Sequence, residues 1–339
     1  MFRTGGLAER HYEFQGASLT VASKHPGVAA AVDYRLRDFR VSTASEDYRL
    51  EFLLDPEPNG DIPKRDISAA DRRASMTDGQ ERRPVYDTPA GSVFYRPATD
   101  ALDASFGGVQ LYGEMGRGLM HIRSARYEPE ERYLAAHPLT MIILGELLKR
   151  RGRYGLHAAC VANGTTGALV AGPSGTGKST LVLALAKTGL AFLSDDMVFL
   201  DHGGSGVEAY GFSDAIGVTQ DTAARFQELA DLASRLPPTG FRKHLIRIEE
   251  RFGIRGADRC RPAFLIFPEL APGHDSALEA MEPQEAWLRL VPDVLVTHPT
   301  ATQAHLAAIA ELTKQVSCYR LRSGRDVNRS AELIGALLR

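Results

Sequence analysis

Short stretches of alternating apolar and polar residues mark the first half of the chain. Tyr48 to Leu54 alternates over most of its length, which is typical of a strand with one buried face. Ser92 to Tyr95 and Gly118 to Ile122 are shorter strand candidates, and Pro26 to Arg37 favours a helix with proline in its first turn. Residues 1–150 are therefore predicted to form a smaller, mixed, strand-rich N-terminal region.

From residue 151 onward, apolar strands alternate with helices. Ala168 to Ala171 is wholly apolar, and Lys178 to Thr188 has a helical pattern that a glycine follows. This alternation predicts an α/β fold for residues 151–339, because such a pattern is typical of sheets covered by helices. Further strands are expected at Ala158 to Ala162, Leu190 to Leu193, Met197 to Asp201, Val207 to Tyr210, Ala263 to Phe267 and Cys318 to Leu321, and further helices at Pro138 to Arg151, Asp221 to Arg235, Thr300 to Gln315 and Asn328 to Leu338.

A long polar stretch at residues 55–84 interrupts the strands of the first half. It is rich in charge, proline and glycine, and such a composition favours a solvated loop. A docking surface for an acidic partner is the alternative. Its basic residues, interleaved with acids, are Lys64, Arg65, Arg72, Arg73, Arg82 and Arg83.

Composition and charge argue against several functional classes. The 339 residues, 44% of them hydrophobic, allow one large or two modest domains. The net charge of -2 provides no basic field for nucleic acid or an anionic membrane, so neither is expected as a partner. Cys160, Cys260 and Cys318 are far apart in the sequence and form no CxxC pair. This spacing argues against a zinc site and a disulfide framework, and it favours a cytoplasmic protein.

A glycine-rich motif follows the apolar strand at Ala168 to Ala171. It fits the phosphate-binding pattern G-x-x-x-x-G-K-[ST], and its residues are Gly172, Pro173, Ser174, Gly175, Thr176, Gly177, Lys178, Ser179 and Thr180. The glycines let backbone N–H groups point at phosphate oxygens, and the following helix adds its positive N-terminal end. Lys178 can reach the β- and γ-phosphates, and the Ser179 hydroxyl can bind Mg²⁺. The motif predicts a site for a purine nucleotide, ATP with Mg²⁺.

Two adjacent acids and one histidine accompany this motif. Asp195 and Asp196 end the strand at Leu190 to Leu193, at the edge where open α/β sheets bind ligands, beside the loop after the neighbouring strand. One carboxylate there can hold Mg²⁺, and the other can accept a proton from an attacking hydroxyl. Because adjacent carboxylates near one metal are coupled, the sequence leaves the assignment of their roles open. Asp195 is taken first as the metal ligand and Asp196 as the base, and the reverse assignment is the alternative. His157 lies directly before the strand expected at Ala158 to Ala162, and it is either structural or catalytic.

The order of these features resembles a known family. Gly155-Leu156-His157-Ala158-Ala159, then Gly172 to Thr180, then Ser194-Asp195-Asp196 look like the C-terminal catalytic domain of HPr kinase/phosphorylase, and more closely like the HPr-kinase-related serine kinases of bacteria. The resemblance covers about Tyr154 to Leu200 and is looser beyond. It implies a P-loop kinase fold related to the nucleotide domain of phosphoenolpyruvate carboxykinase. It also implies that His157 lies beside the acids and the transferred phosphate.

The resemblance implies an ATP-dependent kinase that phosphorylates a hydroxyl, in particular a serine of a small protein or peptide. Lys178, with Mg²⁺ on Ser179 and Asp195, is expected to hold the γ-phosphate, while Asp196 accepts the proton. One more cation is expected to complete the site, and the candidates are Arg242, Lys243, Arg247 and Arg251.

Alternatives to this function stay open at the level of sequence. A kinase for a small hydroxyl-bearing molecule needs the same residues, and a nucleotide-dependent regulatory module needs the phosphate-binding loop without a base. The N-terminal region is expected either to recognise the acceptor or to cover an exposed sheet edge. The identity of the acceptor, a phosphorylase activity and the formation of a homo-oligomer are left open.

Overall fold

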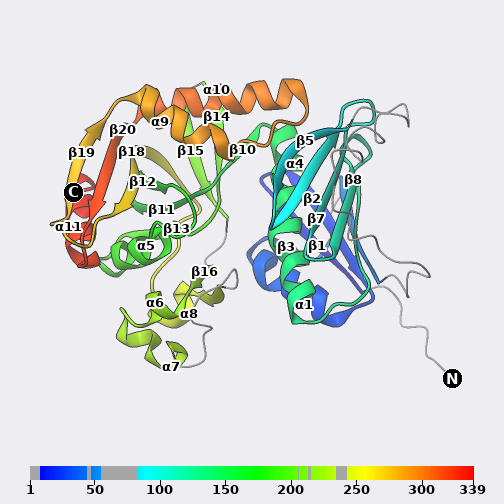
Figure 1. The fold of residues 1–339 in the computed structure, drawn as a ribbon, viewed down its shortest axis with the longest axis horizontal. Coiled ribbons are helices and arrows are strands. Elements are labelled where there is room, and N and C mark those ends of the chain that lie inside the picture. Colours follow the sequence, from blue (N-terminus) through cyan, green and yellow to red (C-terminus); the bar gives the residue numbers. More distant parts are fainter. Residues whose placement is uncertain (1–7, 44–46, 55–81, 205, 213–214, 234–242) are drawn as a thin grey trace. The chain divides into compact units, whose positions relative to one another are not determined.

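The chain folds into two compact units, drawn in Figure 1 from a computed structural model. The structure describes residues 8–43, 47–54, 82–204, 206–212, 215–233 and 243–339. Unit 1 comprises residues 1–151 and 295–302, and unit 2 comprises residues 152–294 and 303–339. Unit 1 therefore takes in a short segment from the second half of the chain. The loop expected at 55–84 lies outside the described residues up to position 81.

Unit 1 is built on a mixed sheet, which has nine strands in the described residues, in the order β3-β1-β2-β4-β9-β8-β7-β6-β5. On β4, Tyr48, Leu50 and Phe52 are buried while Arg49 and Glu51 stay half-buried, which confirms the predicted alternation. Figure 1 shows the helices α1 and α4 beside this sheet. The strands are β1 (Ala8–Phe14), β2 (Ala17–Ser23), β3 (Arg40–Val41), β4 (Tyr48–Leu54), β5 (Arg83–Thr88), β6 (Gly91–Arg96), β7 (Ala101–Phe106), β8 (Val109–Glu114) and β9 (Leu119–Ser124), and the helical segments are α1 (Pro26–Leu36), η1 (Arg37–Phe39), η2 (Met115–Arg117), α3 (Pro129–Leu134), η3 (Ala135–Leu139) and α4 (Thr140–Arg150).

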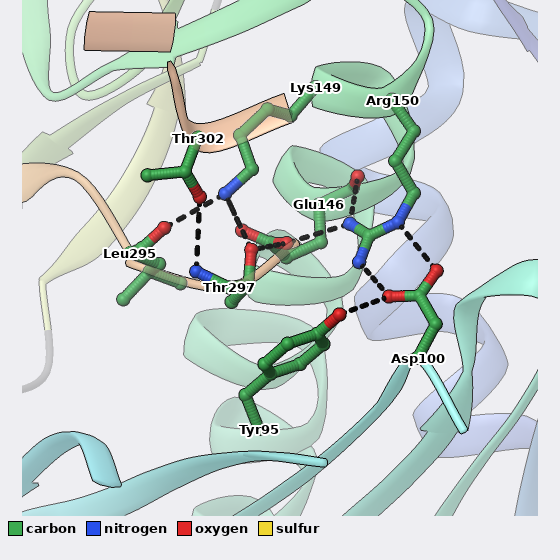
Figure 2. Close-up of polar contacts among 8 residues, drawn as sticks. All are labelled: Tyr95, Asp100, Glu146, Lys149, Arg150, Leu295, Thr297 and Thr302. Atoms are coloured by element: carbon green, nitrogen blue, oxygen red, sulfur yellow. Dashed lines mark hydrogen bonds and ion pairs between the residues drawn. The ribbon is translucent and has the colours of Figure 1, made fainter. Parts of the chain in front are cut away.

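A buried ion pair on α4 binds the segment 295–302 to unit 1. The Lys149 ammonium donates to Oε1 of Glu146 at 2.6 Å, and the two side chains are only 2% and 3% exposed. The same ammonium donates to the carbonyl of Leu295 at 2.9 Å and to the hydroxyl of Thr297 at 2.8 Å (Figure 2). All three N–H donors of the buried ammonium are thereby used, as burial of such a group requires.

Arg150 extends this network to the sheet. Its guanidinium group donates to Oε2 of Glu146 at 2.8 Å and makes two hydrogen bonds to the carboxylate of Asp100, which also accepts from the hydroxyl of Tyr95 (Figure 2). Burial tends to lower the pKa of Lys149, and the adjacent Glu146 carboxylate opposes that shift. The network thus compensates two buried charges on α4 with fixed partners.

Unit 2 is built on one large sheet covered by helices on both faces, which confirms the predicted α/β class, and it also contains a separate two-stranded sheet of β16 and β17. Its main path runs β10-β14-β15-β18-β12-β11-β13, and β20 pairs with both β18 and β19. The strands are β10 (Arg153–Leu156), β11 (Ala158–Asn163), β12 (Thr166–Ala171), β13 (Ala191–Ser194), β14 (Val198–Gly203), β15 (Gly206–Gly211), β16 (Ala215–Val218), β17 (His244–Arg247), β18 (Arg259–Leu270), β19 (Ala277–Met281) and β20 (Ser317–Ser323). The helical segments are α5 (Lys178–Lys187), α6 (Gln220–Ala223), η4 (Gln227–Leu229), α7 (Ala230–Ala233), α8 (Ile248–Phe252), α9 (Pro283–Leu290), η5 (Val291–Asp293), α10 (Pro299–Gln315), whose first residues belong to unit 1, and α11 (Val327–Leu337).

The central strands of unit 2 are apolar on both faces because each face has its own core. α5 and α11 cover one face, and α9 and α10 cover the other (Figure 1). On β12, Ala168 and Val170 pack toward α5, whereas Leu169 and Ala171 pack toward α9. This two-sided burial explains why these strands read as continuous apolar runs in the sequence. None of the described helices is long and apolar enough to cross a membrane.

The single helix expected at Asp221 to Arg235 is wrong. α6 ends after Ala223, and Phe226 adopts an extended backbone with φ -126° and ψ 120°. The Phe226 side chain is buried in the core beside α5, and the short η4 and α7 follow it. Burial of this aromatic ring therefore overrides the local helical pattern.

Replacement of Lys149 by methionine is expected to destabilise the protein by about 1–3 kcal/mol, because buried Glu146 loses its ammonium partner and keeps only Arg150 as a cation. Urea unfolding measures this loss. The matched control is Lys314→Met, which removes an exposed ammonium paired with Glu311 on α10 and should leave the free energy of unfolding nearly unchanged. Equal effects of the two substitutions would contradict the role given to the buried pair.

Candidate functional site

The carboxyl ends of β12 and β13 and the amino end of β11 meet at one edge of the unit 2 sheet. β11 runs antiparallel to both neighbours, with Ala158 opposite Ala171 and Cys160 opposite Ser194. The strand that ends at the acids was expected to be the neighbour of the strand that precedes the loop. The structure corrects this expectation, because β11 lies between β12 and β13. The interposed strand begins directly after His157, and this brings the histidine to the edge that holds the loop and the acids.

The glycine-rich loop curls around its own lysine. Gly172, Gly175 and Gly177 have φ angles of 144°, 87° and 89°. Residues that carry a side chain rarely adopt such positive φ angles. The Lys178 ammonium donates to the carbonyls of Gly172 at 2.6 Å and Pro173 at 3.1 Å. Burial lowers the pKa of Lys178, and the carboxylate of Asp196 opposes that shift. The loop therefore holds a buried cation where an anionic ligand would replace backbone carbonyls.

The other residues of the loop divide into exposed and packed positions. Ser174 is exposed, and the Thr176 hydroxyl donates to the carbonyl of Pro173 at 2.9 Å. Ser179 is buried on the first turn of α5, while the hydroxyl of Thr180 lies 2.9 Å from that of Thr222 on α6. Ser179 is thus the motif hydroxyl that faces the charged groups of the site.

Asp195 is a buried carboxylate at the end of β13. It is only 4% exposed, and its Oδ2 accepts a hydrogen bond from the backbone N–H of Gly217 at 2.8 Å. Burial raises the pKa of Asp195, and the ammonium of Lys243 opposes this shift. The carboxylate therefore depends on nearby cations to stay ionised.

Among the four basic residues considered from sequence, Lys243 reaches the site. Its ammonium lies 3.2 Å from the hydroxyl of Ser179, at the entrance to β17. Arg251 lies elsewhere, since it pairs with Asp231 and donates to the carbonyl of Glu228. Arg247 is buried on β17, and Arg242 lies outside the described residues.

His157 and Asp196 lie close together at this edge of the sheet. Nδ1 of His157 lies 3.4 Å from Oδ1 of Asp196, and the two side chains are about one-third exposed. Asp196 is thus the more accessible of the two adjacent acids, while Asp195 points into the protein. This difference supports separate roles for the acids that the sequence could not distinguish.

The structure adds one acid that the sequence analysis missed. Asp293, at the end of η5, interacts electrostatically with His157 and Lys178. Partial burial raises the pKa of its carboxyl, and these two basic groups oppose the shift. No local sequence motif identifies Asp293, because the packing of α9 and η5, and not its sequence neighbours, positions it at the site.

Asp195 and Ser179 fit a magnesium ion. Oδ1 of Asp195 is buried and has no hydrogen-bond partner among the described residues, so a hard oxygen donor is left available. Within the same residues, no group of three or more His, Cys, Asp or Glu side chains could hold a metal ion. Magnesium commonly binds through one or two protein oxygens together with substrate phosphates, and this donor set matches that pattern.

Comparisons with known proteins leave the family unassigned. No protein-family model and no curated protein matches the chain. Among solved structures, the chain is similar to the Hpr(Ser) kinase/phosphatase from Coxiella burnetii, with 14% sequence identity over 54% of this chain and 87% of that chain and a TM-score of 0.30. A score this low does not establish a common fold.

Replacement of Asp195 by asparagine should stabilise the ligand-free protein in a pH-dependent way. The amide can still accept the hydrogen bond from Gly217, and it removes a charge that burial disfavours. The pKa of Asp195 is raised by folding, so its ionisation costs nothing below the unfolded pKa and costs most above the folded pKa. The gain in the free energy of unfolding should therefore grow as the pH rises above about 4, the pKa of aspartate in the unfolded chain. Urea unfolding over a series of pH values measures this gain, and a gain that shrinks with rising pH would contradict the burial of the charge.

Proposed function

We propose that unit 2 is an ATP-dependent kinase of the HPr kinase-like type, which transfers a γ-phosphate to the hydroxyl of a serine in a small protein or peptide. The observation that carries this proposal is the convergence of a phosphate-binding loop, a buried acid, an accessible acid and a histidine at one sheet edge. A pure nucleotide-binding module needs the loop but has no need for a second, accessible acid beside a histidine.

Lys178 and the loop N–H groups bind the phosphates. The Lys178 ammonium donates to the carbonyls of Gly172 and Pro173. A bound phosphate would replace these carbonyls as the hydrogen-bond acceptor. Lys243, 3.2 Å from the Ser179 hydroxyl, adds a second cation. Ser179 and Asp195 would hold Mg²⁺, which neutralises phosphate charge when it is bound.

Asp196 acts as the general base. The acceptor oxygen bonds to the γ-phosphorus, the bond from that phosphorus to the bridging oxygen breaks, and ADP leaves with the bond's electron pair. The proton of the acceptor hydroxyl passes to the carboxylate of Asp196. His157, 3.4 Å away, orients this carboxylate and stabilises its charge before transfer. Asp195 is unsuited to this step, because its carboxylate is buried and held by Gly217.

Lys178→Ala should lower phosphoryl transfer by on the order of 10²–10³-fold or more and weaken nucleotide binding, since the phosphates lose a preorganised cation. Transfer of labelled phosphate from ATP to candidate serine peptides measures the rate, and calorimetry measures binding. Lys187→Ala, on the same helix but paired with Glu228, is the matched control and should retain both. Near-wild-type transfer by Lys178→Ala refutes the proposal.

Asp196→Asn should retain the affinity for Mg-ATP within a few-fold and lower transfer by about 10²–10⁴-fold, because an amide cannot accept the proton. The same two assays separate the effects. Asp201→Asn, which changes an acid on β14 that pairs with Arg153, is the control and should transfer normally. If Asp196→Asn loses Mg-ATP binding while Asp195→Asn keeps it, the two acids have the reverse roles. Unchanged transfer by Asp196→Asn instead favours a regulatory module without a base.

A further inference from the structure

A cavity of about 330 Å³ adjoins the phosphate-binding loop within unit 2. Its volume lies at the lower end of the range of about 300–1,000 Å³ for small-molecule sites. One wall is the end of β12 with the first part of the loop, and the other is the end of β18 with one side chain of α9. The residues that line it are Ala171, Gly172, Pro173, Thr176, Phe267, Pro268, Glu269 and Arg289.

This cavity lies on the side of the loop away from the candidate catalytic acids. β12 pairs with β11 on one side and with β18 on the other. His157, Asp195 and Asp196 belong to the ends of β11 and β13, whereas Phe267 to Glu269 belong to the end of β18. A nucleotide whose γ-phosphate faces the acids can therefore extend its remaining part toward β18.

We propose that this cavity binds the purine base and ribose of the nucleotide. The inference rests on the proposed function, since it names where the nucleoside part of the same substrate lies. A base needs apolar surface against its faces and a small number of polar groups at its rim. The cavity offers both, with proline and phenylalanine side chains in its walls and the charged groups of Glu269 and Arg289 beside them.

Arg289 is held in place for this role. Its guanidinium group donates to Glu269 at 2.8 Å and to Glu285 at 3.1 Å, and it lies over the ring of Phe267 at 5.5 Å from the centroid. The side chain keeps 32% exposure, so part of the planar group stays accessible. A fixed guanidinium plane stacks on aromatic rings, and a carboxylate accepts hydrogen bonds from ribose hydroxyls or an exocyclic amine.

An exposed leucine extends the apolar surface from the cavity toward the phosphates. Leu270 ends β18 and is 62% exposed. A Cβ atom placed on Gly177 would lie 3.6 Å from its side chain, so Leu270 borders the loop immediately before Lys178. This leucine leaves apolar surface uncovered between the cavity and the phosphate site, next to the side of the ribose that carries the phosphates.

The test compares ATP with inorganic tripolyphosphate, which offers the phosphates without a nucleoside. Arg289→Ala should weaken ATP binding by roughly 3- to 30-fold and leave tripolyphosphate binding unchanged within about twofold. Arg289→Lys, which keeps the charge for Glu269 and Glu285 but loses the plane, should weaken ATP binding in the same direction. Calorimetry measures both ligands. Arg329→Ala, on α11 at the opposite face of the sheet, is the control and should bind both ligands normally.

Four outcomes overturn the nucleoside site. Unchanged ATP affinity in both Arg289 variants, or equal weakening of both ligands in Arg289→Lys, excludes a contact with the base or ribose. A raised KM for the acceptor at unchanged ATP affinity assigns the cavity to the acceptor instead. The Lys178→Ala variant separates a failure of the cavity assignment from a failure of the proposed function. If Lys178→Ala weakens the binding of both ATP and tripolyphosphate, while the Arg289 variants affect the two ligands alike, nucleotide binding at the loop is supported and only the cavity assignment is wrong. A wild-type protein that binds neither ligand overturns both.

Discussion

The burial of β11, β12 and β13 on both faces is the constraint on which the candidate site depends. Helices cover each face, so that the backbone register of these strands is fixed by packing in two directions. The ends of the strands are therefore rigid points, and the loop, the histidine and the acids start from them. Polar groups placed on such a scaffold need little rearrangement to meet a ligand, which is the arrangement that electrostatic catalysis requires.

Charge balance at the sheet edge is the second determinant of the site. Burial disfavours the ionised forms of both Lys178 and Asp195, and each is held by groups of opposite charge nearby. Lys243 and Asp293 add one more charge of each sign. A cluster in which the pKa of a base is lowered and that of an acid is raised is typical of functional sites. Such a cluster lowers the free energy of unfolding, a cost often found where residues serve function and not stability.

Sequence patterns located the local features of the site but not those made by packing. The loop and the acids could be found because each directly follows an apolar strand, and their spacing is a property of continuous chain. Asp293 could not be found, since the interaction with His157 joins residues far apart in sequence. The walls of the cavity meet for the same reason only in the fold, where β18 pairs with β12. Phe226 shows the opposite failure, in which a helical pattern gives way to the burial of one ring.

The buried network of Lys149, Glu146 and Thr297 makes unit 1 discontinuous along the chain. Its segment 295–302 returns from the second half, so the polypeptide passes between the two units three times. A gene fusion or recombination event that joined residues 1–151 to another protein would leave the buried ammonium without the oxygens of Leu295 and Thr297. The two units are therefore poorly suited to recombination as independent domains, and they are expected to occur together in related proteins.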